Sequence, residues 1–179
     1  MKLLVLDRDG VINADSPDYI KSPDEWQPLP GSIEAIARAS NAGYTIAVAT
    51  NQSGVGRGLF DLDMLSAING TMIEAVEAAG GRIDLIVFCP HKPDEGCECR
   101  KPKTGLLRRI DSELGVELAG QWMIGDSIKD IAAARAARMQ PVLVRTGNGV
   151  SVERELQDKT DVLIFDDLAA AVDSLLEEQ

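Results

Sequence analysis

The three cysteines and the single histidine of the chain all lie within one stretch of eleven residues. Cys89 and His91 form one pair, and Cys97 and Cys99 form a second pair after a five-residue gap. Thiolates and imidazoles are preferred zinc ligands, and four protein ligands close a tetrahedron with no position left for water. We therefore predict structural zinc in the loop 89–99. Metal-free or redox-sensitive cysteines, and a zinc knuckle that binds nucleic acid, are the alternatives.

A second group of reactive side chains begins with DRDG, residues 7–10. In an extended segment, residues i and i+2 face the same way, so Asp7 and Asp9 are expected to point together and Arg8 to point away. Two such close carboxylates repel each other unless a cation lies between them. Asp126 adds a third carboxylate, and oxygen ligands favour Mg²⁺. A solvated loop is the alternative for a lone D-x-D.

The elements that must position these residues alternate between short apolar strands and amphipathic helices. This alternation predicts an α/β fold with a doubly wound, Rossmann-like parallel sheet covered on both faces, and Thr104 is the expected N-cap of one helix. No repeat or linker divides the chain, so we expect one domain, 1–179. The expected strands are 3–7, 45–50, 84–89, 122–126, 141–145 and 162–165, and the expected helices are 32–44, 61–81, 104–115, 127–139 and 167–178.

Polar residues follow four of the predicted strands directly. In a doubly wound sheet, ligands bind at the carboxyl ends of the strands, so these residues are expected to meet at one edge. That convergence predicts a site built from several strand ends. The segments are Asp7–Gly10, Thr50–Ser53, the loop that begins at Cys89, and Gly125–Ser127.

Composition restricts the partners of the protein. A hydrophobic content of 45% supports an ordinary core, and a net charge of −11 argues against sequence-independent binding of nucleic acid. No apolar run approaches the roughly 20 residues of a membrane span, and MKLLVLDRDG meets charge too early for a signal peptide. We expect a cytoplasmic protein without membrane or nucleic-acid partners. So acidic a chain needs a bound cation or a local basic cluster to hold an anion.

Four segments resemble the ordered motifs of the haloacid dehalogenase-like phosphatases: LDRDGVI, VATNQSG, CRKP and IGDSIKD. The loop C-P-H…C-x-C-R-K-P is similar to the zinc loop of D-glycero-D-manno-heptose 1,7-bisphosphate phosphatases, which histidinol-phosphate phosphatases share. The segments INADSPDYI and TNQSGVGRG also fit the heptose enzymes. The resemblance implies a minimal cap and Mg²⁺-dependent removal of the 7-phosphate, in the synthesis of ADP-heptose and lipopolysaccharide core precursors. Histidinol phosphate or another small phosphomonoester is the alternative substrate, and a non-enzymatic zinc-loop interaction module is the alternative class.

The resemblance also implies roles for individual residues. Asp7 would attack phosphorus and form an aspartyl-phosphate, and Asp9 would act as acid and then as base. Asp7, the backbone carbonyl of Asp9 and Asp126 would hold Mg²⁺. Thr50 would donate its hydroxyl to a phosphoryl oxygen, and Lys101 would supply positive charge.

The remaining expectations concern the substrate and the oligomeric state. Arg100 would reach the sugar or a second phosphate, and Lys103 is the alternative to Lys101. Ser127 stands where some heptose phosphatases carry lysine, which leaves the preferred anomer open, and Asp130 is either a partner of the site or a helix charge. We expect a monomer. Further substrate contacts are expected at Asp15, Ser16, Pro17 and Asp18, where the alternative is a plain turn, and at Asn51, Gln52 and Ser53.

Overall fold

The computed structural model, which describes residues 1–177, contains a six-stranded sheet with the order β3-β2-β1-β4-β5-β6. All five strand pairings are parallel. The predicted doubly wound α/β fold is therefore confirmed. The strands are β1 (Lys2–Leu6), β2 (Tyr44–Asn51), β3 (Leu85–Cys89), β4 (Trp122–Gly125), β5 (Gln140–Val144) and β6 (Leu163–Phe165).

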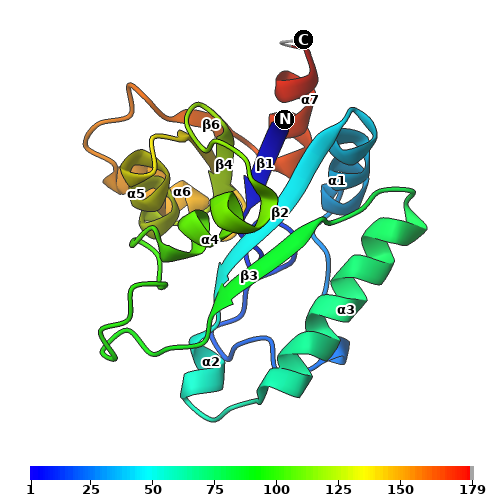
Figure 1. Ribbon diagram of the computed structural model, residues 1–179, viewed down its shortest axis with the longest axis vertical. Coiled ribbons are helices and arrows are strands. Elements are labelled where there is room, and N and C mark those ends of the chain that lie inside the picture. Colours follow the sequence, from blue (N-terminus) through cyan, green and yellow to red (C-terminus); the bar gives the residue numbers. More distant parts are fainter. Residues whose placement is uncertain (178–179) are drawn as a thin grey trace.

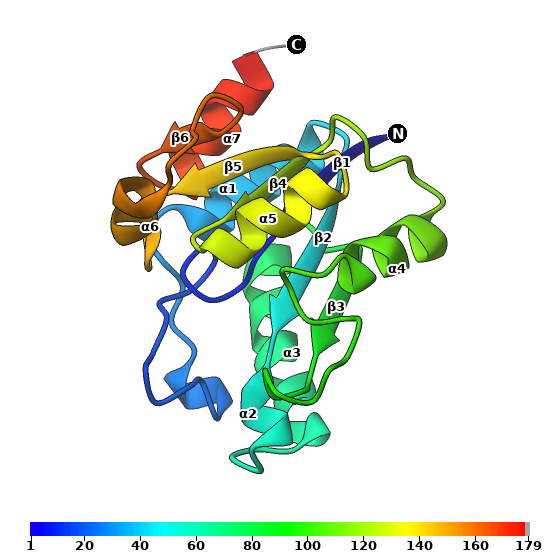
Figure 2. The same cartoon turned by 90° about the vertical axis from the view of Figure 1, so that its left-hand side faces the viewer.

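Helices cover both faces of this sheet (Figures 1 and 2). Helices α1, α3 and α7 pack on one face, and α4, α5 and α6 on the other, each layer with its own apolar cluster. Central strands are apolar on both sides because both faces are buried. The helices are α1 (Ser32–Asn41), α2 (Ser53–Gly56), α3 (Leu62–Ala78), α4 (Gly105–Leu114), α5 (Ile128–Ala136), α6 (Gly149–Glu155) and α7 (Leu168–Glu177), with a 3₁₀ turn η1 (Pro23–Glu25).

The strand order reverses at the boundary between β1 and β4. Leu4 to Leu6 pair with Trp122 to Ile124, so the two strands end side by side. The connections after them leave in different directions, which opens a crevice at the carboxyl ends of the strands. Asp7 follows β1 and Asp126 follows β4, so the fold brings both carboxylates to this crevice.

Sequence periodicity located every strand and five of the helices to within a few residues. Two short helices, α2 and α6, were not predicted, because four and seven residues carry too little periodicity to be recognised. Thr104 occupies the N-cap position of α4, but its side chain makes no capping hydrogen bond. The predicted end of the last helix, residue 178, lies outside the described residues. None of the helices in residues 1–177 is both long and apolar enough to cross a membrane.

Candidate active site

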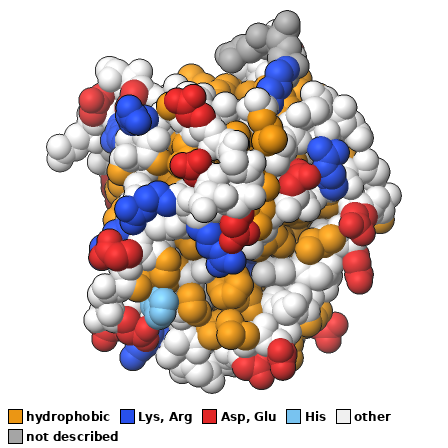
Figure 3. Space-filling model, in the orientation of Figure 1, with side chains coloured by type: hydrophobic (Ala, Val, Ile, Leu, Met, Phe, Trp, Pro, Cys, Tyr) orange, Lys and Arg blue, Asp and Glu red, His pale blue; other side chains and the backbone are white. Residues whose placement is uncertain are grey.

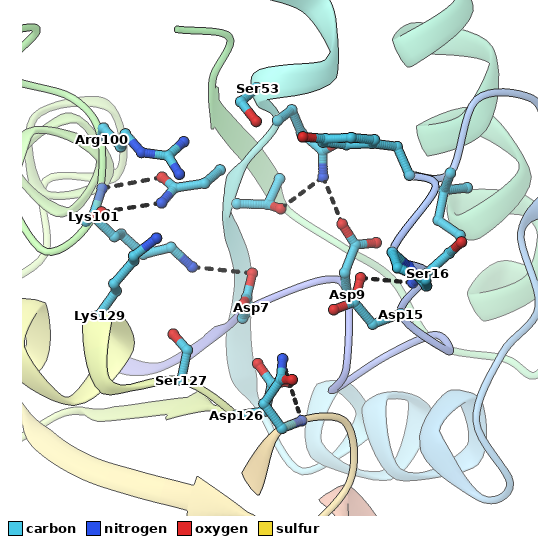
Figure 4. A pocket seen from close by; sticks show the side chains of 17 residues that line it. Asp7, Asp9, Asp15, Ser16, Ser53, Arg100, Lys101, Asp126, Ser127 and Lys129 are labelled. Carbon is cyan, nitrogen blue, oxygen red and sulfur yellow. Dashed lines mark hydrogen bonds and ion pairs between the residues drawn. The ribbon is translucent and has the colours of Figure 1, made fainter. Parts of the chain in front are cut away.

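A pocket of about 360 Å³ lies at the carboxyl edge of the sheet (Figure 4). Most of the predicted site residues line it, from the ends of β1, β2 and β4 and from the loop after β3. Tyr19, Ile20, Lys129 and Asn148 also line it and were not predicted. The predicted residues in its wall are Asp7, Asp9, Asp15, Ser16, Pro17, Thr50, Asn51, Gln52, Ser53, Arg100, Lys101, Asp126 and Ser127.

Asp7 and Lys101 form an ion pair at the floor of the pocket. Lys101 Nζ lies 3.0 Å from Asp7 Oδ1 and 2.7 Å from Asp130 Oδ1, and its side chain is 2% exposed. Burial lowers the pKa of Lys101, but Asp130 and Asp7 outweigh it and raise the pKa above its ordinary value. Lys103 instead pairs with Glu98 at the surface, 2.7 Å away. Of the two candidate lysines, only Lys101 can act beside Asp7.

Asp130 is the second carboxylate that pairs with Lys101, and the start of α5 fixes its position. Its carboxylate accepts hydrogen bonds from the backbone N–H of Ser127, at 3.1 Å, and from the Ser127 hydroxyl, at 2.7 Å. Ser127 in turn caps α5 by accepting from the N–H of Asp130, which completes a capping box. Asp130 is 1% exposed, so it is a buried partner of Lys101 and not a helix charge in solvent.

Asp126 lies against two glycines whose backbones approach it closely. A Cβ on Gly10 or on Gly147 would overlap the Asp126 carboxylate, and both glycines have positive φ. The backbone N–H of Asn148 donates to Asp126 Oδ2 at 2.9 Å. Burial raises the pKa of Asp126 to about 6, although the Asn148 N–H opposes the shift.

The segment that supplies Gly147 and Asn148 follows β5 directly and was missed in the sequence. Thr146 donates its hydroxyl to the carbonyl of Gly10 at 2.6 Å and so joins this segment to the loop after β1. The strand-end rule that located Asp7 and Asp126 also points to the residues after β5. Applied to the fifth strand, it would have found them.

Asp9 is held by several donors, one of which contradicts the sequence prediction. Arg8 was expected to point away, but its Nε lies 3.0 Å from Asp9 Oδ1 and its side chain is 0% exposed. The reason is local: β1 ends at Leu6, and the Arg8 carbonyl accepts from Ile12 N–H at 2.8 Å in the following turn, so strand alternation no longer applies. Asn13 Nδ2 donates to the same Asp9 oxygen at 2.9 Å.

Two residues expected to contact substrate also make contacts inside the protein. Gln52 is 4% exposed, and its Nε2 donates to Asp9 Oδ2 at 2.9 Å and to Thr50 Oγ1 at 3.0 Å. Asn51 binds the backbone of Lys101 twice: its Nδ2 donates to the carbonyl at 3.1 Å, and its Oδ1 accepts the N–H at 3.0 Å. Both residues line the pocket, and the side chains or backbone that they bind belong to the catalytic candidates Asp9, Thr50 and Lys101.

The rim of the pocket carries positively and negatively charged side chains. Arg100 and Lys129 face the pocket in Figure 4, and burial, followed by the charge of Arg100, lowers the pKa of Lys129. Asp15 and Ser16 lie opposite, in a turn where Ser16 N–H donates to Asp15 Oδ1 at 2.8 Å. Asp18 lies outside the pocket lining, and its N–H bonds to Ser16 Oγ at 3.1 Å. Its substrate contact stays a prediction.

Acidic side chains gather at the floor of the pocket and could bind one divalent cation. Burial raises the pKa of Asp7 well above its ordinary value, and Asp130, Asp126 and Asp9 raise it further against Lys101. Four carboxyl groups and two buried cations meet here, so the carboxyl groups outnumber the positive charges. Carboxylate oxygens of Asp7 and Asp126 lie within 4.8 Å of each other, so the residues present fit an oxygen-ligated cation. The carboxylates are Asp7, Asp9, Asp126 and Asp130, and the cations are Arg8 and Lys101.

The cysteine loop forms a separate cluster. Cys89 Sγ lies 3.1 Å from Cys99 Sγ and 3.6 Å from Cys97 Sγ, too far for disulfide bonds. His91 Nδ1 lies 3.2 Å from Cys99 Sγ. Ligands about 2.0–2.3 Å from a tetrahedral zinc stand roughly 3.3–3.8 Å apart. The ligand atoms of all four residues lie within 4.8 Å of one another, so this donor set fits one zinc ion with a small adjustment of the side chains.

The ionisation of this cluster is uneven. Burial and the neighbouring Cys99 raise the pKa of Cys89 to about 12. Burial also acts to raise the pKa of Cys97, but the backbone N–H of Arg100 and the adjacent thiols lower it to about 7. A cation at the centre would favour the thiolate at each position.

The surface of the molecule carries both kinds of charge. On the face shown in Figure 3, Lys and Arg side chains lie scattered among acidic ones.

Comparisons with a family model and with curated relatives point to the same family. A family model described as HAD-hydrolase-like matches residues 98–171. D-glycero-beta-D-manno-heptose-1,7-bisphosphate 7-phosphatases from Pseudomonas aeruginosa and Bordetella bronchiseptica are 59% and 49% identical to this chain, over 98% and 99% of both sequences.

Solved structures give the same result. The crystal structure of D,D-heptose 1,7-bisphosphate phosphatase from B. bronchiseptica, complexed with magnesium and phosphate, matches all of both chains with a TM-score of 0.97. The corresponding enzyme from Burkholderia thailandensis is 41% identical over 98% of this chain and 99% of its own, with a TM-score of 0.78. The chain belongs to the haloacid dehalogenase-like hydrolases, in the family of the heptose-bisphosphate phosphatases.

Proposed function

We propose that this protein removes the 7-phosphate of D-glycero-β-D-manno-heptose 1,7-bisphosphate with the help of Mg²⁺. The observation that carries the proposal is the pairing of Asp7 with Lys101 beside Asp126, at the floor of one pocket. Relatives that match nearly the whole chain are named for this reaction.

In the first step, a carboxylate oxygen of Asp7 attacks the phosphorus of the 7-phosphate. The bond between phosphorus and the sugar oxygen breaks as the Asp7–phosphorus bond forms, and Asp9 gives its proton to the departing oxygen. Asp7 Oδ1 accepts the backbone N–H of Arg8 at 2.7 Å and lies beside Lys101. These two contacts fix the carboxylate, so the attacking group is oriented before the substrate arrives.

In the second step, Asp9 takes a proton from water, which attacks the phosphorus of the aspartyl-phosphate and releases phosphate. Lys101 and Thr50 stabilise the transferring group in both steps. The Thr50 oxygen accepts from Gln52 Nε2 at 3.0 Å, so its own proton is directed elsewhere and can reach a phosphoryl oxygen. A positive charge and a fixed donor at the developing charge are the main contributions that a protein makes to phosphoryl transfer.

Mg²⁺ would be held by Asp7, the Asp9 carbonyl and Asp126, and it would neutralise negative charge on the phosphoryl group. The raised pKa values of Asp7 and Asp126 support this assignment, because they reflect carboxylates that are buried close together without enough positive charge. Asn148 and Gly147 would keep Asp126 directed at the cation.

The rim would bind the rest of the substrate. Arg100 and Lys129 give this side of the pocket the local positive charge that a chain of net charge −11 needs to hold a second phosphate. The turn at Asp15 and Ser16, on the opposite side, would accept hydrogen bonds from sugar hydroxyls. Pro17, Ser53 and Asp18 remain proposed contacts.

The loop 89–99 would bind structural zinc through Cys89, His91, Cys97 and Cys99. Cys99 directly precedes Arg100 and Lys101, so a tetrahedral centre would fix where both cations stand. The Asn51 side chain binds the Lys101 backbone from the other side. On this proposal the zinc is a positioning device and takes no part in bond breaking.

The wider assignments follow from the same reaction. We propose one phosphatase domain over the whole chain, acting in the cytoplasm as a monomer, in the synthesis of lipopolysaccharide core precursors. Histidinol phosphate is the alternative substrate because its phosphatases share the zinc loop. A non-enzymatic interaction module would have no need of an intact Asp7–Lys101 pair.

A phosphate-release screen tests the proposal. Both anomers of the heptose bisphosphate, histidinol phosphate and generic sugar phosphates are compared with and without Mg²⁺. We expect the β anomer to have the highest kcat/KM and no turnover without Mg²⁺. A preference for histidinol phosphate, or equal rates for the Asp7→Asn variant, would contradict the assignment.

A further inference from the structure

Arg8 is a fully buried cation that the proposed chemistry does not use. Its side chain is 0% exposed, and burying a charge costs several kcal/mol unless partners compensate it. Its three nitrogens reach two residues. Nε and Nη2 donate to the two oxygens of Asp9 at 3.0 and 3.3 Å, and Nη1 donates to Asn69 Oδ1 at 3.1 Å.

Asn69 is an unusual residue for its position. It lies inside α3 on the buried face, one turn from Leu65 and Met72, where the neighbours are apolar. It is 8% exposed. Asparagine is a weak helix former, and a buried amide needs a partner. Arg8 Nη1 is the partner that the structure gives to its oxygen.

This arrangement fixes the Asp9 carboxyl on both oxygens. Oδ1 accepts from Arg8 Nε and Asn13 Nδ2, and Oδ2 accepts from Gln52 Nε2 and more weakly from Arg8 Nη2. Asp9 is itself 21% exposed and lines the pocket, so without these contacts it could change rotamer. The hydrogen bond from Arg8 Nη1 to Asn69 restrains the guanidinium at its far end. Helix α3 is therefore linked, through Asn69 and Arg8, to a side chain sixty residues away.

We propose that Arg8, clamped by Asn69, is a positioning residue that holds Asp9 in the orientation for proton transfer to the leaving oxygen. The inference rests on the proposed function, in which Asp9 gives its proton to the sugar oxygen as the P–O bond breaks. Arg8 exchanges no proton and touches no substrate. Its effect is geometric, because a carboxyl that turns away from the leaving oxygen loses general acid catalysis.

The test compares phosphate monoesters whose leaving groups differ in their need for a proton. A sugar alkoxide leaves poorly unless it is protonated, whereas p-nitrophenolate leaves without help. kcat/KM reports the steps up to phosphoryl transfer to Asp7, so later hydrolysis does not obscure the comparison. Asn69→Leu removes the clamp, and Arg8→Lys keeps the charge but loses the planar fork. Thr71→Val, at a half-buried position of α3 where the hydroxyl donates to the Ala67 carbonyl, is the matched control.

We expect Asn69→Leu to lower kcat/KM for sugar phosphates about 10-fold and Arg8→Lys about 100-fold, within the range of general acid catalysis. For p-nitrophenyl phosphate, both variants should stay within about 2-fold of wild type, and Thr71→Val should behave as wild type on both substrates. Equal losses on both substrates, in proportion to lost thermal stability, would show a merely structural role and overturn the proposal. Unchanged rates on both would overturn it as well.

A crystal structure of Asn69→Leu separates this inference from the proposed function. We expect a displaced Arg8 guanidinium and a new Asp9 rotamer. If the wild type hydrolyses no phosphate monoester, the proposed function fails, while the structure of the variant still tests the clamp. An Asp9 side chain that keeps its contacts in the variant would overturn the inference whatever the substrate.

Discussion

The buried Asp126 carboxyl makes the stability of the Mg²⁺-free protein depend on pH. Its pKa is raised from 3.8 to about 6 in the folded protein, mainly by burial. Between these two values the folded protein binds a proton that the unfolded chain has released. The stability that this proton contributes is therefore present at low pH and is lost as the pH rises through about 6.

The size of the effect follows from the two pKa values. At pH 5, one unit below the folded pKa of Asp126, the contribution is about 1.4 kcal/mol, and at pH 8 it is close to zero. For a domain of this size, 1 kcal/mol corresponds to about 2–4 °C in Tm. Asp126→Asn removes the titration, and it also removes a charge that raises the pKa of Asp7. Both consequences make the stability of the variant fall less as the pH rises.

Thermal unfolding of wild type and Asp126→Asn, followed by circular dichroism in Mg²⁺-free buffer without chelator, measures this difference. Between pH 5 and pH 8, the Tm of the wild type should fall by about 3–6 °C more than that of the variant. Asp111→Asn, which removes an exposed carboxylate from α4, should keep the wild-type pH dependence. Equal pH dependence in wild type and Asp126→Asn would refute the reasoning.

Three further predictions test other parts of the site. Lys101→Met should destabilise the fold by about 3–5 kcal/mol and abolish turnover, because it leaves Asp7 and Asp130 unpaired. As the control, Lys103→Met should change the free energy of unfolding, measured with denaturant, by less than about 0.5 kcal/mol. Similar losses in both variants would be inconsistent with Lys101 as the lysine of the site. Asn51→Ala should lower the free energy of unfolding by about 1–3 kcal/mol and lower kcat/KM, because the Lys101 backbone loses both of its hydrogen bonds to the Asn51 side chain. Unchanged stability and kinetics would contradict a role of Asn51 in placing Lys101. Removing zinc with a chelator should lower Tm and activity together, and elemental analysis of the purified protein should find one zinc per chain, whereas metal-free protein with full activity would rule out the zinc proposal.

Much of the fold followed from hydrophobic patterning. The strands are short apolar runs that are buried on both sides, and the longer helices carry clear amphipathic stripes, so both were recognisable. Helices α2 and α6 are too short for a periodic pattern and depend on the loops that they join. Helix α2 shares the connection from β2 to β3 with the longer α3, whereas α6 is the helix that connects β5 to β6. Missing them did not affect the fold class, because the other strands and helices already alternate along the chain.

The site was predictable where a residue follows a strand, and not where a contact depends on tertiary packing. Asp7 and Asp126 follow directly from the ends of β1 and β4. The burial of Arg8 could not be foreseen, because its partner Asn69 lies on a distant helix and the strand ends before Arg8. Gln52 and Asn51 were correctly placed at the pocket, but their hydrogen bonds to Asp9 and Lys101 depend on the packing of three loops.

The most direct test of the central proposal is a ³¹P NMR measurement of heptose 1,7-bisphosphate during turnover with Mg²⁺. We predict that the signal of the 7-phosphate disappears and inorganic phosphate appears, while the 1-phosphate signal persists. The Asp7→Asn variant should leave both signals unchanged while keeping its folded circular dichroism spectrum. Loss of the 1-phosphate, or loss of the 7-phosphate at an undiminished rate in Asp7→Asn, would contradict the account.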